Sequence, residues 1–198
     1  MRILIVGANG TIGRAIATEL SARHEIVTAG RTSGDVRVDM TDLESVRNLF
    51  ATAGKLGAVA CAAGNVHFGP LEAMTPQELD IGLRDKLMGQ VHLVLAGREF
   101  VESGGSFTLI SGILSRDPIR FGASASMVNG AIESFVRAAA VELPHQRINA
   151  VSPTVLAESM DAYGPYFRGY EPVSAKRVAL AFSKSIEGSQ TGQVYRVE

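Results

Sequence analysis

Three glycines near the start of the chain, Gly7, Gly10 and Gly13, have a spacing that can present backbone N–H groups to a phosphate. They follow the apolar run Arg2–Val6 and precede apolar residues at helical spacing, which predicts a strand, a tight turn and a helix. The free N–H groups and the positive end of that helix favour an anionic ligand such as a pyrophosphate. The residues expected to contact a dinucleotide at this turn are Gly7, Asn9, Gly10, Thr11, Ile12 and Gly13.

The end of the next predicted strand indicates which dinucleotide is bound. An acidic residue there would bond a ribose 2′-hydroxyl, whereas an arginine accommodates a 2′-phosphate. The chain has Arg31, Thr32 and Ser33 at this position, a guanidinium followed by two hydroxyls. These residues favour NADP(H) over NAD(H). The alternative interpretation is that Arg31 is a solvated surface residue.

The remaining sequence alternates between patterns typical of strands and of helices. Short apolar runs predict further strands, and longer stretches with apolar residues at helical spacing predict helices between them. The two longest predicted helices run from Pro76 to Phe100 and from Val128 to Leu143, and Pro153 to Pro172 is expected to be a loop over the strand ends. This alternation is typical of an α/β protein with a mostly parallel sheet. The predicted strands cover residues 2–6, 25–29, 36–38, 56–61, 107–110, 147–151 and 193–197.

Composition indicates a single domain, residues 1–198, that acts on a small molecule. The chain is 46% hydrophobic and 20% charged with a formal net charge of −1, so no basic face predicts nucleic acid or a membrane surface as a partner. The first apolar run stops at Gly7, too short for a signal peptide, and we expect a cytoplasmic protein. The single cysteine, Cys61, excludes an intramolecular disulfide and a cysteine-rich zinc site, and no metal is expected.

Several stretches resemble the short-chain dehydrogenase/reductase family. The segment from Val38 to Asp42 is similar to its adenine-binding segment, Ala62-Ala63-Gly64 stands where the family has Asn-Ala-Gly, and residues 147–153 are similar to the stretch leading to its Pro-Gly. The resemblance implies a Rossmann-type doubly wound parallel sheet of about seven strands in the order 3-2-1-4-5-6-7, with helices on both faces. It also implies cofactor contacts from Asp39, Met40, Ala62, Ala63, Gly64 and Pro153.

The resemblance further implies hydride transfer between a nicotinamide and a carbonyl or alcohol, with a tyrosine as the proton donor. In the family a lysine four residues after that tyrosine lowers its pKa. No Tyr-x-x-x-Lys occurs in this chain. With the alignment fixed at the helix end Glu142-Leu143, the tyrosine, lysine, asparagine and serine positions fall on Ala125, Asn129, Lys86 and Gly112, and the glycine after Pro153 is replaced by Thr154.

The catalytic residues therefore stay unknown at this stage, with Lys86, Ser111 and Asn129 as candidates. Lys86 is the first of them because a lysine that loses its hydration also loses its proton more easily, although a surface or interface lysine is the alternative interpretation. Arg116 could hold an anionic substrate, and the predicted loop offers three tyrosines as donors. These are Tyr163, Tyr166 and Tyr170.

Two functions follow from these residues. The first is an NADP(H)-dependent oxidoreductase that acts on a small, unidentified carbonyl or alcohol with a replacement proton donor. The second is a catalytically inactive NADP(H)-binding module that regulates or interacts with a partner. The resemblance also implies a homodimer or homotetramer assembled through the two long helices.

Overall fold

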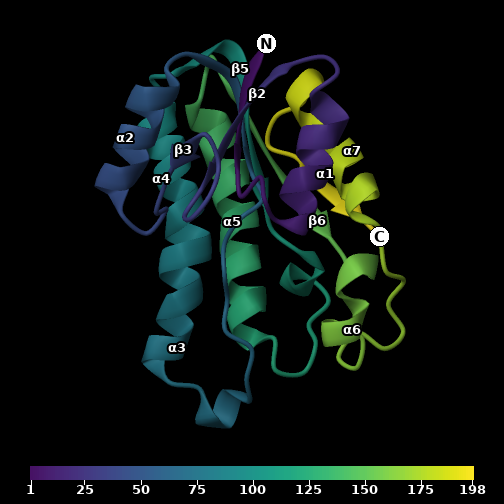
Figure 1. Cartoon of the computed structure of the whole chain (residues 1–198). Helices are drawn as coiled ribbons and strands as arrows, with labels where there is room; N and C mark the ends of the chain where they lie inside the picture. The colour runs from purple at the N-terminus through teal and green to yellow at the C-terminus, as the bar shows by residue number, and fades with distance from the viewer.

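Seven parallel strands form one sheet in the order β3-β2-β1-β4-β5-β6-β7 in the computed structural model, which describes residues 1–198 (Figure 1). The strand order is the one predicted. The register brings the carboxyl ends of neighbouring strands together, because Val6 of β1 lies beside Ala29 of β2 and Cys61 of β4. The strands are β1 (Arg2–Val6), β2 (Glu25–Gly30), β3 (Val36–Arg37), β4 (Leu56–Cys61), β5 (Val101–Ile110), β6 (Arg147–Pro153) and β7 (Val194–Val197).

The central strands are apolar throughout because both faces of the sheet are covered. In β1, Ile3 and Ile5 belong to the hydrophobic cluster on one face, and Leu4 and Val6 belong to the larger cluster on the other face. All four side chains are at most 1% exposed. A strand buried on both sides has no polar positions to alternate with, so its sequence is a continuous apolar run.

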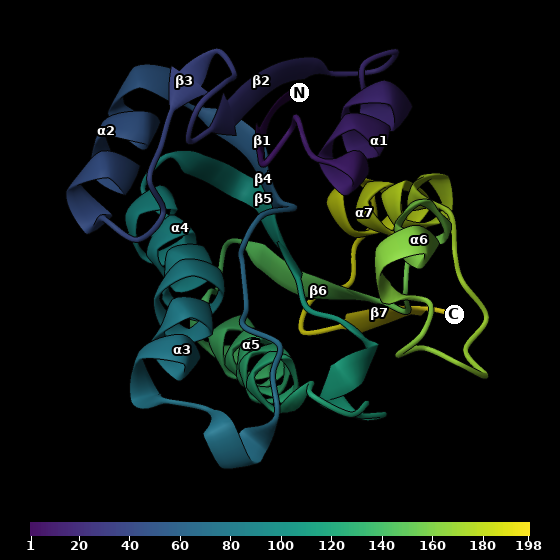
Figure 2. The same cartoon turned by 60° about the horizontal axis from the view of Figure 1, so that its bottom comes forward.

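Helices cover both faces, and Figure 2 shows α1 and α7 on one side of the sheet with α2, α4 and α5 on the other. The α-helices are α1 (Thr11–Leu20), α2 (Leu43–Ala53), α3 (Pro76–Ile81), α4 (Gly89–Gly97), α5 (Ala123–Glu142), α6 (Met160–Tyr163) and α7 (Ala175–Glu187). Shorter helical segments are η1 (Leu71–Ala73), η2 (Gly82–Met88), η3 (Ile113–Ser115) and η4 (Ala157–Ser159). None of the helices combines the length and apolar character needed to cross a membrane.

Local sequence signals explain where two of these helices begin. The Asp42 carboxylate accepts a hydrogen bond from the Glu44 backbone N–H and so caps α2. At α3, Thr75 and Glu78 form a capping box and Pro76 occupies the first turn, where its missing N–H costs nothing.

The predicted helix from Pro76 to Phe100 is instead divided into three parts. Between α3 and α4 lies η2, seven residues of π-helix in which each backbone hydrogen bond spans one residue more than in an α-helix. Apolar spacing cannot distinguish the two kinds of turn over so short a stretch, which is why a continuous helix was expected. Segments of π-helix occur frequently at functional sites. In this chain η2 carries Asp85 and Lys86.

Three other boundaries differ from the sequence prediction. Strand β5 begins at Val101, ahead of the predicted start, and its pairing with β4 shifts register between Val101 and Ser106, where Gly104 has a φ of +82°. Helix α5 begins at Ala123 and gains a further turn ahead of Val128, since its small residues permit close packing. The segment from Pro153 to Pro172 contains η4 and α6 in place of a continuous loop.

Candidate functional site

The glycine turn connects β1 to α1 at the carboxyl edge of the sheet. Gly10 donates its N–H to the Gly7 carbonyl at 3.0 Å, and α1 begins one residue later. A Cβ placed on Gly13 would lie 2.0 Å from the Gly7 carbonyl oxygen, so only glycine lets the helix approach the turn this closely. The first N–H groups of α1 are left free to bind an anion, and this cradle fits a pyrophosphate.

The neighbouring residues of the turn are held by their own contacts. The Asn9 side chain donates a hydrogen bond to the Ser33 hydroxyl, and the Asn9 carbonyl accepts one from Arg14 at 2.6 Å. The first of these bonds ties the glycine turn to the segment after β2. Thr32 is exposed on the same segment.

A cavity of about 180 Å³ opens beside this turn, at the ends of β1, β2 and β4. It has the position of a nucleoside subsite in a doubly wound sheet, where ligands bind outside the carboxyl ends of the strands. We call it the adenosine cavity. The residues that line it are Val6, Gly7, Gly30, Arg31, Val38, Met40, Ala63, Gly64, Asn65 and Asp85.

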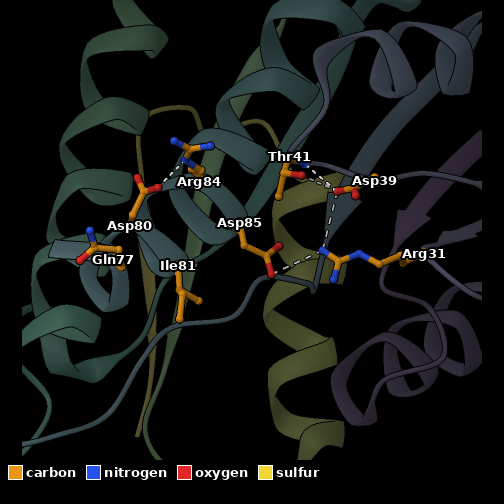
Figure 3. Close-up of a pocket in the computed structure, with 8 residues that line it drawn as sticks. All are labelled: Arg31, Asp39, Thr41, Gln77, Asp80, Ile81, Arg84 and Asp85. Atoms are coloured by element: carbon orange, nitrogen blue, oxygen red, sulfur yellow. Dashed lines mark hydrogen bonds and ion pairs between the residues drawn. The ribbon is translucent and has the colours of Figure 1, made fainter. Parts of the chain in front are cut away.

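The Arg31 guanidinium, which lines the adenosine cavity, lies between two carboxylates (Figure 3). Its Nη2 atom is 3.7 Å from Oδ1 of Asp39 and 3.6 Å from Oδ2 of Asp85. Asp39 is fixed by Thr41, whose hydroxyl and backbone N–H donate at 2.8 and 3.0 Å and hold the pKa of the carboxyl below its usual range. The sequence identified Arg31 and Asp39 as site residues but not Asp85. Asp85 lies 54 positions after Arg31, in a helical segment whose sequence carries no motif that marks it.

A second cavity, of about 380 Å³, lies beyond the glycine turn between β5, α5 and the segment after β6. We call it the inner cavity. It brings together all three catalytic candidates, Lys86, Ser111 and Asn129, although they are far apart in the sequence. Other lining residues include Ile12, Gly64, Val66, Phe68, Gly112, Ala125, Pro153, Thr154, Tyr163 and Phe167.

Lys86 is the only charged residue that lines the inner cavity. Its Nζ donates a hydrogen bond to Oδ1 of Asn129 at 2.8 Å and another to the Ser111 carbonyl oxygen at 3.2 Å. No carboxylate is paired with it. Burial therefore lowers the pKa of the Lys86 ammonium to about 8, because the charged form has lost most of its hydration.

Gly64 makes room for this lysine at the end of β4. A Cβ on Gly64 would lie 2.7 Å from Cγ and 2.8 Å from Cα of Lys86, and Gly64 has a φ of +128°, where other residues are strained. The glycine thus allows η2 to pack directly against the strand end that separates the two cavities.

The Ser111 hydroxyl points away from Lys86. It donates to Oε1 of Glu133 at 3.0 Å, and the same carboxylate oxygen accepts a bond from the Ser115 hydroxyl at 2.7 Å. Glu133 is almost fully buried on α5. Glu133 lies four residues after Asn129 and so on the same face of α5, a spacing by which the sequence could have indicated that Glu133 is near the site. The Ser111 group that faces Lys86 is its carbonyl.

The other residues considered as donors or anchors lie in different places. Arg116 contacts Ser152 at 3.0 Å and Glu198 at 2.8 Å and does not line the inner cavity, so its role in holding an anionic substrate stays a prediction. Of the three tyrosines only Tyr163 lines this cavity. The Tyr170 hydroxyl is bonded to the Asp117 carbonyl. Thr154 lines the cavity with a hydroxyl that has no partner within the chain.

Similarity to known proteins decides the family. The family model described as "Enoyl-(Acyl carrier protein) reductase" matches residues 11–187. The chain belongs to the short-chain dehydrogenase/reductase family. Members of this family are oxidoreductases that use nicotinamide cofactors, and the glycine turn of this chain leads directly into α1, where the matched region begins.

Individual short-chain dehydrogenases and reductases resemble the chain along most of its length. Trihydroxynaphthalene reductase PfmaI of Pestalotiopsis fici is 30% identical over 195 residues, which cover 85% of this chain and 68% of the fungal enzyme. The crystal structure of the protein lin1944 from Listeria innocua is 47% identical, with a TM-score of 0.98 and full coverage of both chains. A small-chain dehydrogenase solved in complex with NADPH is 27% identical, with a TM-score of 0.89 and coverage of 100% of this chain and 96% of its own.

Proposed function

We propose that this protein is an NADP(H)-dependent reductase of small, neutral carbonyl compounds in which the Lys86 ammonium donates the proton. The observation that carries the proposal is the environment of Lys86. This lysine lines the inner cavity, has no carboxylate partner and has its pKa lowered to about 8 by burial. A general acid works best when its pKa lies close to the pH of the reaction.

The family positions support this role for Lys86. The lysine expected on α5 is replaced by Asn129, and the asparagine expected on the preceding helix is replaced by Lys86, so lysine and asparagine have exchanged places. The two side chains remain in contact, with Nζ of Lys86 2.8 Å from Oδ1 of Asn129. Because Ala125 occupies the tyrosine position, α5 offers no tyrosine hydroxyl as the proton donor.

A bound nicotinamide supplies the hydride for the carbonyl carbon. The contribution of the chain is the proton. As the carbonyl oxygen gains negative charge, an N–H bond of Lys86 breaks and an O–H bond forms, which leaves a neutral amine that water protonates again. Asn129 and the Ser111 carbonyl accept the other two N–H groups and so direct the third toward the cavity.

The cofactor we propose is NADP(H). Arg31 can bind a 2′-phosphate through two parallel N–H groups, and Thr32 and Ser33 add hydroxyl donors beside it. The similar dehydrogenase described with NADPH supports the same assignment.

The substrate we propose is neutral because most residues that line the inner cavity are hydrophobic, and Lys86, its only charged group, is assigned to proton donation. Phe68, Tyr163 and Phe167 provide aromatic surface along its wall. Aromatic side chains pack well against flat rings. The relatives named trihydroxynaphthalene reductase and versicolorin reductase support an aromatic ketone in preference to an aliphatic one.

The proposal can be tested by following the loss of NADPH absorbance in the presence of different carbonyl compounds. The panel contains neutral aromatic, neutral aliphatic and anionic compounds. Turnover of a neutral ketone should be lost in Lys86→Met and retained in Lys176→Met, a matched change at an exposed lysine of α7. The second candidate function, a binding module without turnover, is favoured by Ala125 and by the engagement of the Ser111 hydroxyl with Glu133. Tight NADPH binding with no turnover of any carbonyl would support the module and refute the reductase.

A further inference from the structure

The Arg31–Asp85 ion pair divides the cofactor cleft into two compartments. Both residues line the adenosine cavity, and both also line a larger, outer cavity of about 440 Å³ (Figure 3). The two cavities have no other lining residue in common. The adenosine cavity alone, at about 180 Å³, is smaller than the roughly 300–1,000 Å³ that small-molecule sites occupy. Separating Arg31 from Asp85 would join the two compartments into one cleft of sufficient size.

The two partners of this pair differ in mobility. The Asp85 side chain is only 12% exposed, and its Oδ2 also accepts a hydrogen bond from Nδ2 of Asn65 at 2.6 Å. The Arg31 side chain is 55% exposed, and its contacts with Asp39 and Asp85 exceed 3.5 Å. Asp85 is therefore the fixed partner, still hydrogen-bonded when the pair opens, and Arg31 is the one that can swing outward.

We propose that Asp85 sets the affinity for the cofactor by holding Arg31 across the adenosine cavity, so that an adenosine can bind only after this ion pair opens. The inference rests on the proposed role of Arg31 as ligand of a 2′-phosphate. Any adenine nucleotide must separate the pair. A nucleotide that carries a 2′-phosphate then gives the released guanidinium a new anionic partner, whereas one without it leaves Arg31 in solvent.

This arrangement predicts opposite effects for two nucleotides when Arg31 is removed. In Arg31→Ala the cavity is already open, so 5′-ADP should bind about two- to fivefold more tightly, the factor expected for an ion pair with one exposed partner. The same change removes the phosphate ligand, so 2′,5′-ADP should bind at least about tenfold more weakly. A residue that only contributes positive charge to the site would weaken both.

Removing the charge of Asp85 should open the same pair from its other side. Asp85→Asn keeps an amide oxygen to accept the bond from Asn65, and both nucleotides should bind about two- to fivefold more tightly. The matched control is Asp80→Asn, an equal charge change in the outer cavity at a carboxylate paired with Arg84 at 2.5 Å. The affinity of this control for either nucleotide should change less than that of Asp85→Asn.

Isothermal titration calorimetry of the full chain measures the affinities for 5′-ADP and 2′,5′-ADP. The proteins compared are the wild type, the three single variants and the double variant Arg31→Ala/Asp85→Asn. For 5′-ADP the double variant should match Arg31→Ala and Asp85→Asn, because one ion pair can be opened only once. The proposal is overturned if Asp85→Asn binds both nucleotides more weakly, as a direct ligand would, or no differently from Asp80→Asn. If only the 2′,5′-ADP result for Arg31→Ala fails, the phosphate assignment is wrong and the closing role of Asp85 stands.

Discussion

Carbonyl reduction by this protein should depend on the charge of Lys86 and should therefore decline as the pH rises through about 8. Burial lowers the pKa of the ammonium to this value, and reduction uses the protonated form. About nine tenths of the lysine is protonated at pH 7 and about one tenth at pH 9, so kcat/KM should fall about tenfold between these pH values. Alcohol oxidation uses the neutral amine and should rise over the same range.

Changing the partner of Lys86 should move this pH dependence in a known direction. Asn129→Asp places a carboxylate where an amide oxygen now lies 2.8 Å from Nζ. An opposite charge at that distance favours the ammonium, so the pKa should rise by about 1–3 units and the decline of kcat/KM should move to correspondingly higher pH. Lys86→Met should lower kcat by at least about a hundredfold, the smallest contribution usual for general acid catalysis.

Initial rates of NADPH oxidation between pH 6 and pH 10 measure this effect, with NADPH binding followed over the same range as the control. Binding should stay constant while kcat/KM changes. The reasoning is refuted if residual activity in Lys86→Met keeps the same pH profile, or if Asn129→Asp retains activity with an unshifted decline.

Three further predictions concern positions around the site and on the surface. Gly64→Ala should destabilise the fold by about 1–3 kcal/mol in urea denaturation, because its backbone has a positive φ and its Cβ would collide with Lys86; an unchanged midpoint would contradict the close packing. Glu187→Gln should remove stability that the wild type has above about pH 4.5 and loses as the pH falls toward 2, since hydrogen bonds, first of all from Arg23, hold the pKa of this carboxyl at about 2. The difference at neutral pH, about 1–2 kcal/mol after solvent screening, should vanish by about pH 2. Leu95→Glu, on the exposed face of α4, should lower the mass measured by light scattering if the chain forms the expected homo-oligomer, and an unchanged oligomer would place the interface elsewhere.

The sheet and the glycine turn were predictable because their signals are local. The turn at Gly7 follows a buried strand directly, and the apolar runs fix each strand within a few residues. The strand order came from the family resemblance, which the matched family model and the topology confirm. Boundaries failed where a local signal was ambiguous, as at Gly104-Gly105, two glycines that were expected to end the preceding helix and that lie within β5.

The site was predictable only in part because its contacts join distant elements. Lys86, Ser111 and Asn129 were identified one at a time from the family positions, and the sequence gives no means of learning that the Ser111 hydroxyl turns toward Glu133. Asp85 was missed since nothing in a helical pattern marks which carboxylate will face an arginine in the segment after β2. Long-range pairing of charges depends on the packing of η2 against β4, which a periodic pattern does not describe.

The π-helical turn of η2 makes the chemistry of the two cavities depend on a single residue of chain length. Deleting one residue within Gly82–Met88 would restore a regular α-helix and rotate the residues ahead of the deletion by about 100° relative to those after it. Asp85 lines the adenosine cavity and Lys86 lines the inner cavity, and the two residues are consecutive in η2. A shift of the backbone in η2 would therefore move both side chains together. A shortened protein of this kind would keep its helix and lose the alignment between the two ends of a bound dinucleotide, so we expect a deletion in this segment to disturb the site more than a substitution does.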